Sequence, residues 1–153
     1  MAIGSVLTNS FKTELLKGFH SFDTSGATPA GSVFKIALYN SSASLGTTTT
    51  AYTTTEELAT ATGYTRPGNT LVNTGVGVST VTSYTDFTDT SWTSASFTAR
   101  GCLIYNTDVL SGFTTNRSVC TIDFGGNKTV SSGTFTVQFP TNDSSDAIIR
   151  ITS

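Results

Sequence analysis

Charge is the scarcest property of this sequence. Asp, Glu, Lys and Arg make up 12% of its 153 residues, against about 25% in ordinary soluble domains. The eight Lys and Arg are scattered and the formal net charge is −2, so the sequence lacks the basic cluster by which nucleic-acid-binding surfaces are recognised. We therefore expect no nucleic acid among the partners.

Long apolar runs are also lacking. No stretch approaches the roughly 20 apolar residues that cross a bilayer, and residues 1–10 have neither a basic start nor an apolar signal core. We therefore expect no membrane partner, and we expect the protein to be synthesised in a cytoplasm.

Groups suited to catalysis or metal binding are few. His20 is the only histidine, and it follows a predicted helix, where a histidine commonly acts as a cation near the C-terminal end. One histidine and two distant cysteines cannot complete a tetrahedral zinc site, so we expect no metal and no other cofactor. Three acid pairs lie in polar, loop-like stretches and are predicted to be solvated rather than catalytic: Glu56/Glu57, Asp86/Asp89 and Asp143/Asp146. The sequence therefore predicts that the protein is not an enzyme.

Cys102 and Cys120 are the only cysteines. A hairpin centred near Ser111 would place them opposite each other on neighbouring strands. One interpretation is a disulfide, worth about 3 kcal/mol in the chain-entropy model. The other is a pair of small buried thiols in a reducing cytoplasm, which the lack of a signal peptide favours.

Hydrophobic periodicity predicts one helix, over residues 5–20. Leu7, Phe11, Leu15 and Phe19 recur every four residues and Leu16 widens the stripe, while Ser5 is a candidate N-cap. Gly18 is a candidate helix-ending residue. The apolar stripe needs a hydrophobic surface beside it, either the protein's own sheet or a neighbouring subunit.

The rest of the chain reads as short strands separated by turns. Residues 63–69 are dense in turn formers, with a strand starting only after Pro67. A hairpin turn is predicted at Gly125-Gly126-Asn127-Lys128, and region 40–62 is either an exposed Thr-rich loop or contains a short helix at 55–59. The predicted strands are 33–39, 71–79, 84–88, 91–93, 97–106, 118–124, 134–139 and 147–152.

This pattern predicts an all-β fold. Seven or eight short strands and one N-terminal amphipathic helix favour an antiparallel β-sandwich of jelly-roll or related Greek-key type. By length, residues 1–153 form a single domain.

Three segments carry a resemblance to a known family. They are T-A-R-G-C-L-I-Y-N at 98–106, N-R-S-V-C-T-I-D-F-G-G-N-K-T at 116–129 and S-S-G-T-F-T-V-Q-F-P at 131–140; shorter matches are F-K-x-E-L-L-x-G at 11–18, V-F-K-I-A-L-Y at 33–39 and A-I-I-R-I at 147–151. Together they resemble the small virion structural proteins of tailed bacteriophages, of the capsid decoration (cement) type. The resemblance implies small apolar residues at the positions of Cys102 and Cys120.

The resemblance also implies a role. We expect a decoration protein on the outer capsid surface of the virion that stabilises the shell, with the major capsid protein and copies of itself as partners, a trimer being favoured over a dimer. A head-fibre base or tail-associated adhesin that grips host glycans is the alternative, as is a tail or connector part. The residues expected to contact partners are Phe11, Leu15, Leu16 and Phe19 of the helix and Trp92, the only indole.

Overall fold

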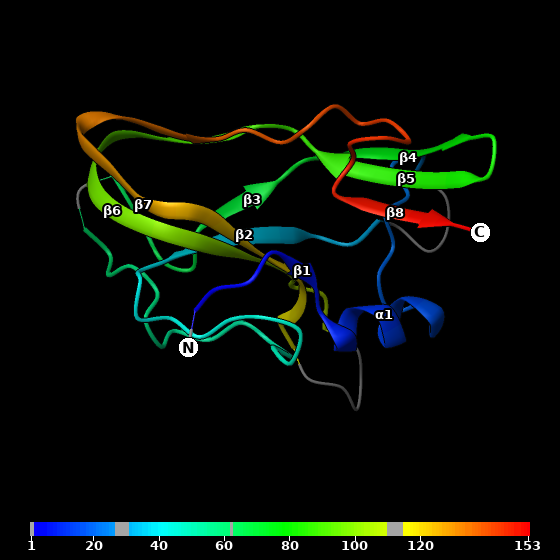
Figure 1. Cartoon of the computed structure of the whole chain (residues 1–153), viewed down its shortest axis with the longest axis horizontal. Coiled ribbons are helices and arrows are strands. Elements are labelled where there is room, and N and C mark those ends of the chain that lie inside the picture. Colours follow the sequence, from blue (N-terminus) through cyan, green and yellow to red (C-terminus); the bar gives the residue numbers. More distant parts are fainter. Residues whose placement is uncertain (1, 27–30, 62, 110–114) are drawn as a thin grey trace.

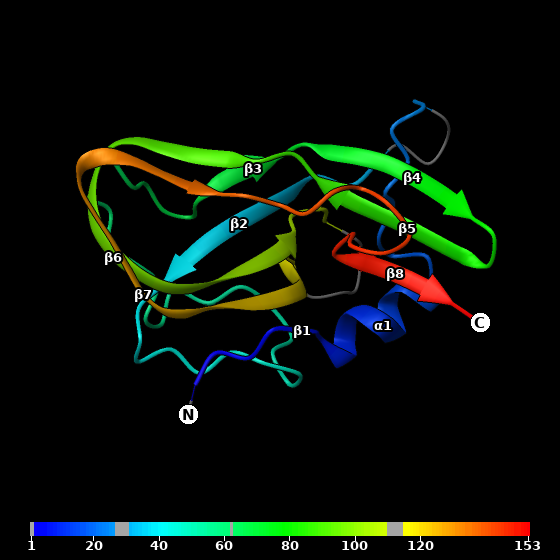
Figure 2. The ribbon, with the colours of Figure 1, turned by 45° about the horizontal axis from the view of Figure 1, so that its top comes forward.

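The chain is mostly β-structure, arranged in two antiparallel sheets with one short helix (Figures 1 and 2). We describe a computed structural model that covers residues 2–26, 31–61, 63–109 and 115–153. The five-stranded sheet has the order β1-β7-β6-β2-β3, and the three-stranded sheet has the order β4-β5-β8. The elements are β1 (Val6–Leu7), α1 (Asn9–Leu16), β2 (Phe34–Tyr39), β3 (Asn69–Leu71), β4 (Asn73–Ser79), β5 (Thr82–Phe87), β6 (Thr90–Asn106), β7 (Arg117–Val137) and β8 (Ile149–Thr152).

The frame of the molecule is a long two-stranded ribbon. β6 has 17 residues and β7 has 21, and they pair from Thr90↔Val137 to Asn106↔Arg117. In Figure 1 the two strands curve together around one end of the molecule. The predicted short strands 91–93 and 97–106 are therefore one strand, as are 118–124 and most of 134–139, because bulges bend the ribbon without ending it.

The predicted hairpin turn at Gly125 to Lys128 is wrong, because these residues lie within β7. Ala99 pairs with Lys128 and Gly101 with Asp123, so a step of two residues on β6 faces a step of five on β7. Gly125 takes a φ of 73° and donates its backbone N–H to Asp123 Oδ1 at 2.9 Å. Turn-forming residues thus produce a large bulge here, because β6 continues to supply a partner on both sides of it.

The N-terminal segment is divided between a strand and a helix. The helix covers only Asn9–Leu16, and Val6–Leu7 pairs with β7 as β1, so the predicted helix over 5–20 is too long. Thr8, rather than Ser5, is the N-cap and accepts from the backbone N–H of Phe11. Gly18 does end the helix, with a φ of 74° and its N–H bonded to the Leu15 carbonyl.

Residues 40–61 form a loop held against the five-stranded sheet. Its backbone bridges join Glu57 to Tyr39 and Ala51 to Arg117, and residues 55–59 form no helix. Ala43 and Leu45 are buried in a small core beneath it. Their neighbours in that core are Ile3, Ala37, Tyr39, Leu103 and Tyr105.

The three-stranded sheet extends beyond the ribbon, on the same end of the molecule as α1 (Figure 1). β4 and β5 form a hairpin whose tip is Thr80 and Val81, since Ser79 pairs with Thr82. β8 adds to the other edge of β5. The buried Asp86 ties β5 to the chain before β8, because its carboxylate accepts from the backbone N–H of Ile148 at 3.2 Å.

The backbone at Gly68, just before β3, passes very close to the backbone of β2, and a substitution can test this close approach. Its φ is 86°, and a Cβ there would overlap the carbonyl oxygen of Ile36. We expect Gly68→Ala to lower the free energy of unfolding by about 2 kcal/mol or more, because strain and overlap add. Gly46→Ala is the control, since nothing lies within 4 Å of its added Cβ. If urea denaturation gave the same loss of unfolding free energy for both variants, the close approach of Gly68 to Ile36 would be contradicted.

Candidate functional site

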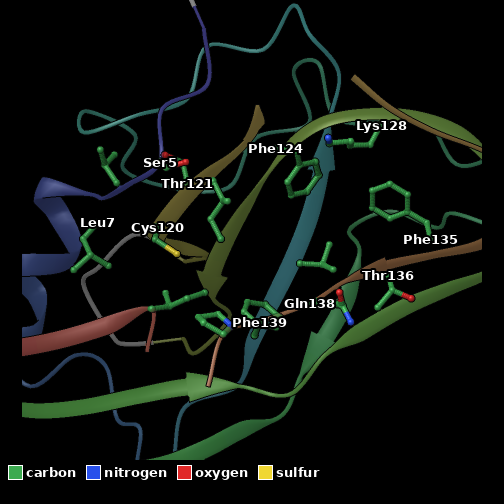
Figure 3. A pocket seen from close by; sticks show the side chains of 15 residues that line it. Ser5, Leu7, Cys120, Thr121, Phe124, Lys128, Phe135, Thr136, Gln138 and Phe139 are labelled. Atoms are coloured by element: carbon green, nitrogen blue, oxygen red, sulfur yellow. The ribbon is translucent and has the colours of Figure 1, made fainter. Parts of the chain in front are cut away.

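An open apolar groove lies between β1 and the first part of β7 on one side and the end of β7 on the other. Its volume is about 680 Å³. Leu7, Phe124, Phe135 and Phe139 surround the opening in Figure 3. The remaining lining residues are Ser5, Val6, Cys120, Thr121, Ile122, Lys128, Thr136, Val137, Gln138, Pro140 and Ile148.

The bent ribbon and the short first strand together create this groove. Because β7 curves back with β6, Phe124 and Phe135 come within 6.1 Å of each other, ring centre to ring centre. β1 pairs only with Thr121 and Cys120, so it covers little of this edge of β7. The rings of Phe124, Phe135 and Phe139, which line the groove, are therefore half-buried rather than sealed.

The chemistry of the groove suits binding rather than catalysis. Lys128 is its only charged lining residue. Cys120 is its only thiol, and burial raises the pKa of that thiol to about 12, which leaves it protonated at neutral pH. Beside the groove, Arg100 and Asp123 form a bidentate pair at 2.7 and 2.9 Å, and this pairing lowers the pKa of Asp123.

A second apolar surface lies on the underside of the three-stranded sheet. Val78, Ser83 and Ile151 are successive cross-strand neighbours, as are Val76, Thr85 and Ile149, so the side chains of each row share a face. Val76, Val78 and Ile151 are each more than half exposed. A hollow of about 350 Å³ separates this face from Leu15 and the chain that follows α1. We call Val76, Val78 and Ile151 the arm face.

The structure separates the five predicted contact residues. Phe11 and Trp92 are 1% and 4% exposed and belong to the protein's own core, so neither is presented to a partner. Leu15 is half-buried against that core, and Phe19 is half-buried with Arg117 over its ring at 5.8 Å. Leu16 is 91% exposed. Only Leu16 therefore offers its full side chain to a partner.

The burial of Trp92 also bears on the glycan-binding alternative. Its ring lies among Tyr64 and Phe135, at 6.1 and 6.0 Å between ring centres. A sugar-binding aromatic residue needs an exposed ring face, which Trp92 does not have in this structure. The single indole is a core residue because β6 directs it into the bend of the ribbon.

The two cysteines are not directly opposite each other. Cys102 pairs with Ile122 and Cys120 with Ile104, two residues away from the predicted register. A register shift between Ile104 and Tyr105 contributes to the offset, and the predicted hairpin centre at Ser111 lies outside the described residues. Both thiols are free and buried, and burial raises the pKa of each.

Sequence reasoning missed a buried carboxylate that holds loop 40–61 in place. Glu57 is 3% exposed, so the prediction that it is solvated is wrong. Its carboxylate accepts from the hydroxyls of Tyr52 and Tyr64 at 2.6 and 2.7 Å, and Arg66 Nε lies 3.3 Å away. The prediction is also wrong for Asp86, which is fully buried. The sequence does place two tyrosines within seven residues of Glu57, but only the fold brings their hydroxyls to its carboxylate.

The prediction for His20 is also wrong. Its ring is 5% exposed, and desolvation by burial lowers its pKa, so it is a neutral imidazole at neutral pH rather than a helix-terminal cation. Its partners are Glu14 and Asn106. Polar groups on three segments thus meet beneath the end of α1.

Two searches of the described residues complete the description of candidate sites. No set of three or more His, Cys, Asp or Glu side chains in the described ranges could hold a metal ion. No helix in the same ranges has the length and apolar character needed to span a membrane. The chain matches no protein-family model, no curated protein and no solved structure.

Proposed function

We propose that this protein is a non-catalytic structural component of a tailed-phage virion. It binds the outer surface of the capsid as a decoration protein and stabilises the shell. Its partners are the major capsid protein and further copies of itself, in a trimer rather than a dimer. For the fold we propose an antiparallel sandwich of jelly-roll or related Greek-key type, supported by the two antiparallel sheets.

One observation carries this proposal. The β6–β7 ribbon forms the frame of the fold, whereas the arm face and Leu16 form an apolar surface that nothing in the described structure covers. The resemblance to phage decoration proteins lies mainly in residues 98–106 and 116–140, which belong to the β6–β7 ribbon and the chain just after it. The arm face and Leu16 are apolar and exposed on β4, β8 and the end of α1, outside the ribbon. Exposed apolar side chains that gather in a patch are typical of a protein interaction site.

The occupant that we propose for the arm face is the major capsid protein. The low charge of the chain supports this, since like charges on densely repeated copies would repel over about 8 Å at physiological salt. Many weak contacts on a repeated lattice also give high avidity without a large interface at each copy.

A shell-binding experiment tests the role. Empty expanded shells of the virus that encodes the chain are mixed with purified protein, and the bound copies are counted after sedimentation. We expect saturation at hundreds of copies per shell and a higher melting temperature of the shells. Saturation at a dozen or fewer copies would instead support the tail or connector alternative, and glycan binding without shell binding would support the adhesin.

Val78→Asp tests the proposed surface. A charge placed in a desolvated contact should weaken shell binding by at least tenfold, which corresponds to about 1.4 kcal/mol. Val109→Asp is the matched control, because Val109 is equally exposed but lies on the connection between β6 and β7. Equal binding by the two variants would exclude the arm face as the shell contact. Circular dichroism of both variants checks that the fold is kept.

A further inference from the structure

His20 lies in a buried polar junction between the end of α1 and the adjoining ends of β6 and β7. Its Nε2 is 2.8 Å from Glu14 Oε2, and its Nδ1 is 3.1 Å from Asn106 Nδ2. The Phe11 ring packs against the imidazole at 4.9 Å between ring centres. Both ring nitrogens are therefore engaged by side chains away from solvent.

The orientation of Asn106 determines which nitrogen of His20 carries the proton. Asn106 Oδ1 accepts from the backbone N–H of Asp108 at 2.8 Å, and its Nδ2 donates to the Phe19 carbonyl at 3.2 Å. The amide nitrogen consequently faces His20 Nδ1, so Nδ1 must be the acceptor. The imidazole is then neutral, with Nε2–H donating to Glu14.

Three charged groups from different segments act on this imidazole. Glu14 on α1 favours the cation, as does Asp108 after β6, while Arg117 at the start of β7 opposes it. Arg117 Nε is 3.6 Å from Glu14 Oε2, and its Nη2 donates to the Phe19 carbonyl at 3.3 Å. Burial outweighs the two carboxylates and lowers the pKa of His20 below 6.5.

We propose that this junction is an acid-sensitive latch: a proton taken up from solvent by Nδ1 of His20 breaks its contact with Asn106 and releases the backbone at Phe19 and Asp108. Nδ1–H and the Asn106 amide are both donors and cannot face each other. Turning the amide would satisfy Nδ1–H, but it would present Nδ2 to the Asp108 N–H and withdraw the donor from the Phe19 carbonyl. Protonation therefore either leaves two donors facing each other or, if Asn106 turns, costs both of its backbone contacts.

The loosening is local, since the latch joins only the chain after α1 to the loop end of the ribbon. The arm face is on different strands and the latch does not depend on the proposed function. In mild acid the end of α1 and the chain around Asp108 should open together, while the centre of the five-stranded sheet stays closed.

Nuclear magnetic resonance can follow the latch in the full chain, because His20 is the only histidine. We expect imidazole ¹⁵N shifts of the Nε2–H tautomer at neutral pH and a titration midpoint below 6.5. Hydrogen exchange at the Asp108 amide, corrected for its intrinsic pH dependence, should accelerate by up to about tenfold per pH unit through the titration. The Ile104 amide should show no such acceleration.

Asn106→Asp should reverse the effect of protonating His20, so that the proton strengthens the junction. A carboxylate oxygen facing Nδ1 accepts from the protonated ring and moves the midpoint of His20 above 6.5, and the acceleration at Asp108 in mild acid should disappear. Asn127→Asp adds the same charge at an exposed position on β7 and should leave the midpoint unchanged.

Three results would overturn the latch. They are an Nδ1–H tautomer in the wild type, a wild-type midpoint at or above 6.5, and a titration of His20 that leaves exchange at Asp108 unchanged. All three are measured on the wild-type protein, so a poorly folded Asn106→Asp variant would not protect the proposal.

Discussion

Glu57→Ala is expected to lower the free energy of unfolding by about 3 kcal/mol, because it leaves two hydroxyls without their acceptor. The Glu57 side chain is fully buried and accepts from Tyr52 and Tyr64. Arg66 is the less costly partner to leave unpaired, since its side chain is 36% exposed and water can reach it. Urea denaturation measures the loss.

Two further substitutions show whether the loss comes from the Glu57 hydrogen bonds or from the removal of a negative charge in general. Glu57→Gln keeps one oxygen acceptor for the tyrosines and should lose less than Glu57→Ala. Glu56→Gln should change stability by no more than about 0.5 kcal/mol, because Glu56 is exposed. A loss for Glu56→Gln as large as that for Glu57→Ala would contradict the assignment of the buried acceptor to Glu57.

Above about pH 10, the stability of this protein is expected to fall steeply with pH. Tyr39, Tyr64 and Tyr105 are buried, and desolvation raises the pKa of each well above the ordinary value of 10.0. Above about pH 10 the unfolded chain loses these phenolic protons while the folded chain keeps them. The contribution of these residues to stability is therefore complete below pH 10 and is lost as the pH rises. Each of these groups adds up to about 1.4 kcal/mol per pH unit to the slope, so the three tyrosines together contribute about 4 kcal/mol per pH unit. Tyr52, Cys102 and Cys120, whose pKa values burial also raises, add to the slope in the same direction.

Urea denaturation at increasing pH, with tyrosinate absorbance recorded in parallel, tests this slope. Tyrosinate should appear together with unfolding rather than before it. Tyr39→Phe removes one of these groups and should reduce the slope by up to about 1.4 kcal/mol per pH unit. It should also lose about 1 kcal/mol at neutral pH, since the Tyr39 hydroxyl donates to the Thr53 carbonyl at 2.6 Å. Full ionisation of the tyrosines in the folded protein would show that they are not buried as described.

The contrast between the Gly125 to Lys128 segment and the Arg66 to Asn69 segment shows the limits of local sequence. Both contain turn formers, and a strand begins only after Pro67 as predicted, although it starts at Asn69 and the predicted strand 71–79 is divided between β3 and β4. The Gly-Gly segment forms a bulge instead, because β6 continues to pair beyond it. Turn propensity describes only the segment itself, whereas the partner strand that keeps the ladder going lies about 25 residues away in the chain.

The acidic residues and the histidine show the same limit. Glu57 and Asp86 were expected to be solvated because they lie in polar, loop-like stretches, and His20 was expected to be a cation at the end of the helix. Their partners come from other segments: Tyr64 and Arg66 for Glu57, the Ile148 amide for Asp86, and Asn106 for His20. A polar residue can be buried only where such partners converge, and convergence is a property of the tertiary structure.

The strand-like runs of β-branched and aromatic residues and the four-residue apolar period at the N-terminus were enough to predict a mostly β chain with one N-terminal helix, since both act through local backbone preference and burial. Gly18 could be identified as the end of that helix for the same reason. Only the tertiary structure decided that Phe11 and Trp92 pack inside while Leu16 and the arm face remain exposed. The bend of the β6–β7 ribbon and the three-stranded sheet determine which apolar side chains are covered, and neither feature is encoded in any single segment.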